Sequence, residues 1–389
     1  MKLLIGADLV PTKSNSNLFC QAETETLIGS QLKKLLAEAS YRIFNLETPL
    51  ADQNSPIDKC GPCFCAGTQT VNGIKALGAD FLTLANNHIL DQGEPGLLST
   101  MSILRGAGIS FAGAGKNVGE AAKPYITEIE GKRIGIFCCA EHEFSIADKN
   151  RMGANPYDPL ESFDTVASLK EACNFLIVLY HGGKEYYRYP SPNVQKLCRK
   201  FVDKGADLVV CQHTHCIGCE ERYATGTIVY GQGNFLFDNS EKEAWQTGLL
   251  IGCEINKNGA VITYYPLRKH GNTVCLADEN DAEFIMAGFR KRSEEIKSEE
   301  TMLERYRALA NESYMQLMRR VNGKGTSTLF FRMMQSLFGE QYLKQHLKKR
   351  YDKNALLVLR NTIESESWRE LIITAITEKN SENIGPCKK

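Results

Sequence analysis

The amino-acid sequence predicts an α/β fold followed by a C-terminal helical appendage. From residue 1 to 277, short continuous apolar runs alternate with segments of helical spacing. Such runs are typical of strands in a sheet that helices cover on both faces, because both sides of each strand are then buried. Residues 278–379 are predicted to be a helical region, of which 283–320 is rich in Glu, Lys, Arg, Met and Leu with helical periodicity, and 380–389 is expected to be a disordered tail.

The predicted elements follow one another in a regular order. Five apolar runs predict strands that each end at polar side chains: Leu3–Ile5, Tyr41–Phe44, Phe81–Ala85, Phe175–Tyr180 and Leu208–Val210. Further strands are predicted at 133–139, 227–230, 248–255 and 260–265, the last two as a hairpin. Helices are predicted at 27–40, 93–106 and 191–204 and, in the appendage, at 283–320, 328–348 and 354–377.

The composition excludes several classes of protein. The chain of 389 residues is 43% hydrophobic and 24% charged, as in ordinary globular proteins. Its 46 basic and 46 acidic residues cancel, so bulk charge predicts no nucleic-acid or membrane-surface partner, although a local patch for a polyanion is compatible with it. No apolar stretch reaches the ~18 residues of a membrane span, and the first apolar run is short for an export signal. We therefore expect a cytoplasmic protein with its 14 cysteines reduced.

Two Cys-x-x-Cys pairs leave alternatives open. Cys60 and Cys63 form one pair, and Cys216 and Cys219 form the other. Such a pair is either redox-active or half of a zinc site. The two pairs lie far apart in sequence, unlike those of common zinc modules. A structural zinc site, a redox protein that uses Cys60 and Cys63, and ordinary loop thiols are the three interpretations, of which loop thiols are favoured.

Metal-ligating side chains follow the five apolar runs. Ligands of open α/β sheets bind outside the carboxyl ends of the strands, so these side chains are expected to converge there. Asp8 and Glu47 supply carboxylates, and a carboxylate can bridge two ions at roughly 3.5–4 Å separation. His213 and His215 lie two residues apart and would point to the same side of an extended strand end. The alternatives are a turn or cap for Asp8, a surface acid for Glu47 and a structural role for the histidines.

Asn87, His88 and His181 complete the predicted site. Asn87 offers a carbonyl oxygen as a metal ligand, and the adjacent His88 would face the substrate as a general acid. Asp91 is within reach of His88 and would fix its tautomer and raise its pKa. His181 follows the most apolar strand and is a predicted ligand. The alternative is that Asn86-Asn87-His88 is an ordinary polar turn.

Carboxylate, amide and imidazole donors together suit one or two Mn, Fe or Zn ions. Such ions activate water and polarise a scissile ester or amide, so the sequence predicts metal-assisted hydrolysis. No serine-hydrolase elbow, Walker loop or dinucleotide fingerprint competes with this interpretation.

Several ordered motifs within residues 2–238 resemble the capsule-synthesis CapA (poly-γ-glutamate synthesis) family. The motifs are Asn45–Leu50, Leu84–Gly93, His181–Tyr186, Gly205–His215 and Tyr230–Phe235. That family is similar to calcineurin-like metallophosphatases. The resemblance implies a metallophosphatase-like four-layer sandwich, with two mixed β-sheets flanked by helices, over 1–277. It does not extend to the helical region.

The resemblance also implies roles for individual residues. Asp8 and His215 would hold one ion, and Asn87, His181 and His213 the other, with Glu47 as the bridge and His88 as the acid. Two residues depart from the metallophosphatase pattern: Val10 stands where a histidine is usual, and Glu47 where an aspartate is usual. The first ion is thus short of a ligand.

Two functions follow from the resemblance. One is a metal-dependent hydrolase that acts on a phosphoester or on an amide of a polyanionic surface polymer. The other is a non-catalytic component of capsule assembly that uses the fold as a scaffold and contacts a capsule synthase through its C-terminal helices.

Overall fold

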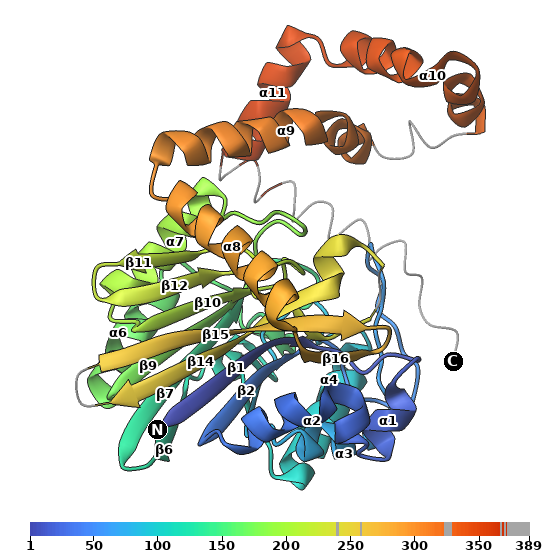
Figure 1. Cartoon of the computed structure of the whole chain (residues 1–389). Coiled ribbons are helices and arrows are strands. Elements are labelled where there is room, and N and C mark those ends of the chain that lie inside the picture. Colours follow the sequence, from blue (N-terminus) through green and yellow to red (C-terminus); the bar gives the residue numbers. More distant parts are fainter. Residues whose placement is uncertain (239–240, 257–258, 323–328, 366–367, 369–370, 372–389) are drawn as a thin grey trace. The chain divides into compact units, whose positions relative to one another are not determined.

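The computed structural model describes residues 1–238, 241–256, 259–322, 329–365, 368 and 371. Its strands form two large mixed sheets and one small one (Figure 1). The eight-stranded sheet contains β1 (Lys2–Leu9), β2 (Tyr41–Leu46), β3 (Phe81–Thr83), β4 (Ser110–Ala112), β13 (Asn234–Leu236), β14 (Thr247–Asn256), β15 (Gly259–His270) and β16 (Thr273–Leu276). The six-stranded sheet contains β6 (Tyr125–Ile129), β7 (Lys132–Ala140), β9 (Phe175–His181), β10 (Leu208–Gln212), β11 (Glu220–Tyr223) and β12 (Gly226–Tyr230). β5 (Ala114–Gly115) and β8 (Gly153–Ala154) form the small sheet.

Both large sheets combine a parallel centre with antiparallel edges. β1, β2, β3 and β4 run parallel, whereas β14, β15 and β16 are joined in antiparallel pairs. In the other sheet β7, β9, β10 and β12 are parallel, and β6 and β11 are antiparallel edges. The parallel strands read as continuous apolar runs because they are buried on both faces.

Helices cover the outer faces of the two sheets (Figure 1). The helices and 3-10 turns of this part of the chain are α1 (Ser16–Cys20), α2 (Thr24–Ala37), η1 (Thr68–Thr70), α3 (Val71–Ala76), α4 (Gly93–Ala107), α5 (Val118–Ala121), α6 (Ser162–Ala172), α7 (Pro192–Asp203) and η2 (Glu243–Gln246). The largest buried cluster contains residues of both sheets, such as Ile5 and Ile177. A second cluster joins Val178 of β9 to Leu169 of α6 and Phe201 of α7. The predicted sandwich of two mixed sheets flanked by helices is therefore confirmed.

The chain divides into two compact units, Met1–Glu304 and Arg305–Lys389. The predicted boundary after residue 277 stays a prediction, and the first unit also takes in α8 (Glu279–Glu295). Ile285 and Phe289 of α8 pack against Ile217 and Leu249 of that unit. The helix predicted over 283–320 is interrupted, because α9 (Glu299–Asn322) begins afresh after Ser298, whose hydroxyl accepts the Thr301 N–H.

The second unit contains α10 (Leu329–Arg350), α11 (Lys353–Glu364) and most of α9. Met318 and Leu347 form its small buried cluster, with Tyr342 and Leu356 packed against them. The predicted tail, 380–389, and much of 366–379 lie outside the described residues. Among the described residues, no helix combines the length and the apolar character that a membrane span requires.

Candidate metal centre

The five predicted strand ends meet, and they come from both large sheets. The eight-stranded sheet contains three of these strands, β1, β2 and β3. The six-stranded sheet contains the other two, β9 and β10. Strand register aligns the donors: Asp8 lies opposite Asn45 and Asn234, and His181 lies opposite Gln212. The carboxyl ends of both parallel centres therefore face one buried space, which is where α/β sheets bind ligands.

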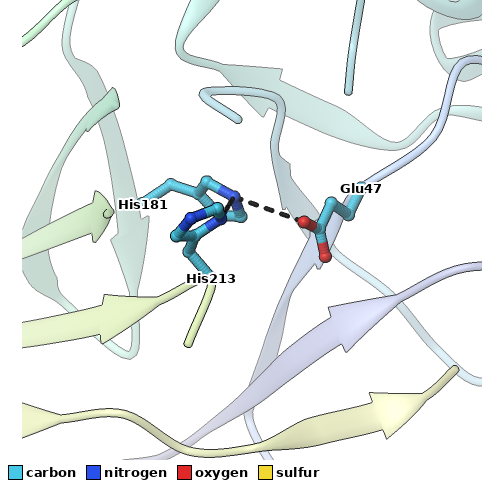
Figure 2. A group of neighbouring side chains, drawn as sticks. All are labelled: Glu47, His181 and His213. Carbon is cyan, nitrogen blue, oxygen red and sulfur yellow. Dashed lines mark hydrogen bonds and ion pairs between the residues drawn. The ribbon is translucent and has the colours of Figure 1, made fainter. Parts of the chain in front are cut away.

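One group of donors surrounds the Nε2 atom of His181 (Figure 2). This nitrogen lies 3.3 Å from Glu47 Oε1, 3.1 Å from Asn87 Oδ1 and 3.1 Å from His213 Nδ1. Burial lowers the pKa of His181 to about 4 and that of His213 well below its usual range. Both imidazoles are therefore neutral near pH 7, the form in which histidine ligates a metal.

The carboxylate of Glu47 indicates what this space would hold. Glu47 is fully buried, and neither of its oxygens has a hydrogen-bond partner in the described structure. Burial, reinforced by the negative charge of Asp8, raises the pKa of Glu47 well above its ordinary value. A buried carboxylate without partners either keeps a proton or requires a cation to compensate its charge. A divalent ion at this position fits the donor set, because it would satisfy these oxygens together with the neutral histidines.

A second group of donors consists of Asp8, Glu47 and His215. His215 Nδ1 lies 3.4 Å from Asp8 Oδ2 and 2.9 Å from Asn234 Oδ1. Burial alone would lower the pKa of His215, but the carboxylates of Glu47 and Asp8 outweigh it and raise the pKa to about 9. Asp8 shows the opposite balance. Burial alone would raise its pKa, but the hydrogen bond and the positive charge of His215 have the larger combined effect, so the pKa of Asp8 is lowered. This side of the centre thus forms a charged pair.

Apolar side chains border the second group. Val10 is 2% exposed and packs in a cluster with Phe237 and Trp245. The indole of Trp245 stacks on the His215 ring, with centroids 4.6 Å apart and an angle of 29° between the planes. The second group therefore offers three protein ligands, whereas the first offers four when Asn87 is counted.

His88 and Asp91 lie beside these groups. His88 Nδ1 is 2.6 Å from Asp91 Oδ2, which leaves Nε2 of His88 for other partners. Asp91 pulls the pKa of His88 upward as expected, but burial has the larger effect, so the pKa is lowered. The predicted rise of this pKa is therefore wrong, and its physical reason is desolvation.

Lys59 is a residue of this site that sequence reasoning missed. Its ammonium group donates to Asp91 Oδ1 at 2.6 Å and to the Asn87 carbonyl at 3.4 Å, and only 3% of its side chain is exposed. Asp91 also accepts the backbone N–H of Phe64 at 2.6 Å, and the Phe64 ring lies 4.2 Å from the His88 ring. The loop that carries the first Cys-x-x-Cys thus closes over the His88–Asp91 pair. No local pattern marks this lysine, since it lies in a loop, directly before Cys60.

Glu141 and Glu143 were also missed. Glu141 Oε1 lies 3.4 Å from His213 Nε2, and Glu143 Oε2 accepts a hydrogen bond from Asn87 Nδ2 at 3.1 Å. Burial raises the pKa of Glu141. Both acids follow β7, another continuous apolar run, so the same rule of strand ends would have identified them.

The backbone at the two neighbouring histidines differs from the expected geometry. β10 ends at Gln212, and His213 and His215 have φ angles of 89° and 52°. The expectation that both histidines lie on an extended strand end is therefore wrong. Left-handed conformations are rare for residues other than glycine and cluster at functional sites, where the surrounding structure enforces them.

The thiols of the described cysteines are not among the candidate metal ligands. Every cysteine in the described residues is a free thiol, and burial raises the pKa of Cys63. Cys216 and Cys219 are buried, whereas Cys60 is exposed. Within the described part of the chain, the groups of side chains that could hold a metal contain no cysteine. These observations favour ordinary thiols over a structural zinc site.

Known proteins are similar in sequence to about half of this chain. The capsule biosynthesis protein CapA of Bacillus anthracis is 29% identical over 215 residues, which are 54% of this chain and 49% of the relative. The PGA biosynthesis protein CapA of Bacillus subtilis (strain 168) is 28% identical over 194 residues, 49% of this chain and 51% of the relative. The chain thus spans about half the length of the curated relatives it matches.

Among solved structures, a phosphatase of Mycoplasma pneumoniae aligns with a TM-score of 0.43 and 14% identity, over 69% of this chain and 93% of that chain. This overlap carries no functional argument. The family model named "Bacterial capsule synthesis protein PGA_cap" matches residues 8–239, the part of the sequence that carries the strand ends and their donors. The chain therefore belongs to the PGA_cap family of bacterial capsule synthesis proteins.

Proposed function

We propose that the protein is a metal-dependent hydrolase of capsule or poly-γ-glutamate biosynthesis, which hydrolyses a phosphoester or an amide with metal-activated water. The observation that carries this proposal is the fully buried Glu47 carboxylate, which lacks hydrogen-bond partners and faces two neutral histidines. Burial and the negative charge of Asp8 disfavour the ionised form of Glu47, and a bound cation would compensate that charge.

The donors suggest how the ions would be held. Glu47, Asn87, His181 and His213 would hold one ion, and Asp8, Glu47 and His215 a second, with Glu47 shared. The mixture of carboxylate, amide and imidazole ligands suits Mn, Fe or Zn. Since the second group has only three ligands beside Val10, we expect the first ion to bind more tightly.

One or two such ions would supply Lewis-acid chemistry, by lowering the pKa of a water molecule and polarising the scissile bond. The chain itself supplies the proton transfer. Asp91 holds Nδ1 of His88, so that Nε2 can exchange a proton with the leaving group. An anionic substrate beside His88 would raise its lowered pKa again, and this would favour the protonated form that acts as an acid.

The names of the relatives support a proposal for the substrate class. Relatives are named for the biosynthesis of capsule and PGA, so we propose a polyanionic polymer or a phosphoester as substrate. Free thiols throughout the described residues are compatible with the predicted cytoplasmic location, because disulfides are rare in that compartment.

Elemental analysis of the purified protein tests the metal centre. We expect one to two transition-metal ions per chain, and we expect the variant with His213→Ala and His215→Ala to lose them. His270→Ala is the matched control, because His270 is exposed and lies on β15, outside the donor groups. A metal-free wild type under metal-replete conditions would contradict the proposal.

A hydrolysis assay distinguishes a catalytic protein from a non-catalytic scaffold. With Mn added, we expect cleavage of an aryl phosphate or a γ-glutamyl amide, and we expect His88→Ala to abolish it while the metal is retained. The second candidate function, a non-catalytic component of capsule assembly, is favoured by the apolar Val10 at the ligand-poor side of the centre. A wild type that holds metal but cleaves neither substrate would support this second function.

The C-terminal helices are proposed to contact a capsule synthase. Residues 354–377, which include most of α11, are the predicted contact segment. Their deletion should leave the metal content unchanged and abolish co-purification with the synthase. Co-purification that survives the deletion would exclude this segment as the contact.

A further inference from the structure

A cluster of cations lies outside the candidate metal centre, around a cavity of about 410 Å³. The cavity lies between α8 and the segments that follow β9 and β10. We call it the arginine pocket and define it by six of its lining residues: Arg188, Ile217, Glu243, Ile285, Lys291 and Arg292. None of its lining residues belongs to the donor groups of the metal centre.

Backbone carbonyls hold the two guanidinium groups in place. Arg188 donates from Nη1 to the Ile217 carbonyl at 3.2 Å, and Arg292 donates from Nε to the Gly218 carbonyl at 2.7 Å. Consecutive carbonyls thus fix two arginines that come from distant parts of the chain. The Nη atoms of Arg292 have no hydrogen-bond acceptor among the described residues, so they remain available to a ligand in the pocket.

The charges in the arginine pocket do not balance. Three cationic side chains face one carboxylate, that of Glu243. Arg188 Nη2 lies 2.6 Å from Glu243 Oε2, but the Glu243 side chain is 75% exposed. Ion pairs with exposed partners contribute little to stability, so a ligand can displace Glu243 from Arg188.

The surroundings of Arg292 add to this imbalance. Burial, followed by the positive charge of Arg188, lowers the pKa of Arg292. Two neighbouring guanidinium groups repel each other in a partly buried pocket unless an anion lies between them. Guanidinium forks also match the oxygens of a carboxylate or phosphate in bidentate hydrogen bonds.

We propose that the arginine pocket binds an oxyanion group, a carboxylate or a phosphate, through Arg188 and Arg292, with Lys291 contributing its charge. This site is distinct from the metal centre and does not depend on hydrolysis there. Its location, on segments that continue from His181 and His215, places it at the same end of the two sheets as the metal centre.

Isothermal titration with two probes, inorganic phosphate and a short glutamate oligomer, tests the arginine pocket. Each titration is made on the full chain, with metal and after chelation, because phosphate would also bind a metal ion. We expect binding that survives chelation, weakens with added salt, and is about tenfold to a hundredfold weaker in Arg188→Gln and in Arg292→Gln, as expected for a charge-assisted hydrogen bond. Arg290→Gln is the matched control: it removes the same charge from α8, but its exposed side chain pairs with Glu283 outside the pocket.

The outcomes separate the possible ligands and the possible failures. Tighter binding of the oligomer identifies a carboxylate ligand, and tighter binding of phosphate identifies a phosphoryl ligand. If Arg292→Gln does not fold, the proposal is tested with Arg188→Gln and Arg188→Lys. The Arg188→Lys variant keeps the positive charge but loses the bidentate hydrogen bonds of the guanidinium group. The proposal is overturned if neither probe binds after chelation, or if Arg290→Gln weakens binding as much as the pocket variants. Metal content is measured on the same samples, so that a failure of the metal centre is recognised separately.

Discussion

Replacing the buried carboxylate by its neutral isostere, Glu47→Gln, should change stability in opposite directions with and without metal. In the metal-free protein the variant should be more stable than the wild type, because it removes a carboxyl group whose ionised form is disfavoured in the folded state by burial and by Asp8. In the metal-loaded protein it should be less stable, because it removes a shared ligand. Few substitutions outside a metal site would reverse sign in this way.

The magnitude follows from binding linkage. An ion present at one hundred times its dissociation constant stabilises the folded state by about 2.7 kcal/mol. For a unit of this size, about 2 °C per kcal/mol gives a rise in the unfolding midpoint of about 5 °C for the wild type. Glu47→Gln should show less than half of that rise.

The pH dependence has a definite sign in the metal-free protein. The folded-state pKa of Glu47 is raised, so the folded protein retains a proton that the unfolded chain releases, and stability falls as pH rises above about 4.3. The advantage of the variant should therefore grow from pH 4 upward.

Differential scanning calorimetry with chelator or with added Mn measures both arms of this experiment. Glu128→Gln is the control, since Glu128 is an exposed acid on β6 away from the donors. If Glu47→Gln and Glu128→Gln respond alike to the metal, or if the metal-free variant is less stable than the wild type, the reasoning about the buried carboxylate is refuted.

Three further predictions concern the fold and the thiols. Thr100→Val removes the hydroxyl that accepts a hydrogen bond from the buried Leu50 N–H at 2.8 Å. The free energy of unfolding, measured by urea titration, should fall by about 1–3 kcal/mol. An unchanged urea midpoint would contradict this prediction. Gly218→Ala would place a Cβ atom 1.6 Å from a backbone carbonyl oxygen and should destabilise by about 3 kcal/mol or more, whereas Gly106→Ala, with open space around it, should not destabilise. Because burial raises the pKa of Cys63, mass spectrometry should show it alkylated at neutral pH more slowly than a free cysteine, and rapid labelling would favour the redox interpretation.

Much of the fold could be predicted from the sequence because local patterns determine it. The five apolar runs became strands of the two parallel centres, and Ser191 caps α7 as its position before Pro192 indicates. The distribution of these strands between two sheets was not predictable, because an apolar run carries no information about its partner. The break between α8 and α9 was also missed, since neither glycine nor proline marks it and the buried Ile296 and Met302 decide it by tertiary packing.

The candidate site was predictable only where its residues follow strands. Asp8, Glu47, Asn87, His181, His213 and His215 lie together, and their roles as ligands stay a prediction. The role of Lys59 was not predictable from the sequence, because this residue contacts Asp91 from a loop without any periodic pattern. The pKa of His88 was misjudged because a sequence shows the nearby acid but not the burial.

The stack of Trp245 on His215 gives this protein a built-in optical reporter. Indole emission is sensitive to a ring packed against it and to that ring's charge, and His215 carries a positive charge unless its proton is displaced. The sequence contains only one other tryptophan, Trp368, which is half exposed. Occupation of the ligand-poor side of the centre should therefore be visible as a change in intrinsic fluorescence, and the Trp368→Phe variant would assign that signal to Trp245 without any added label.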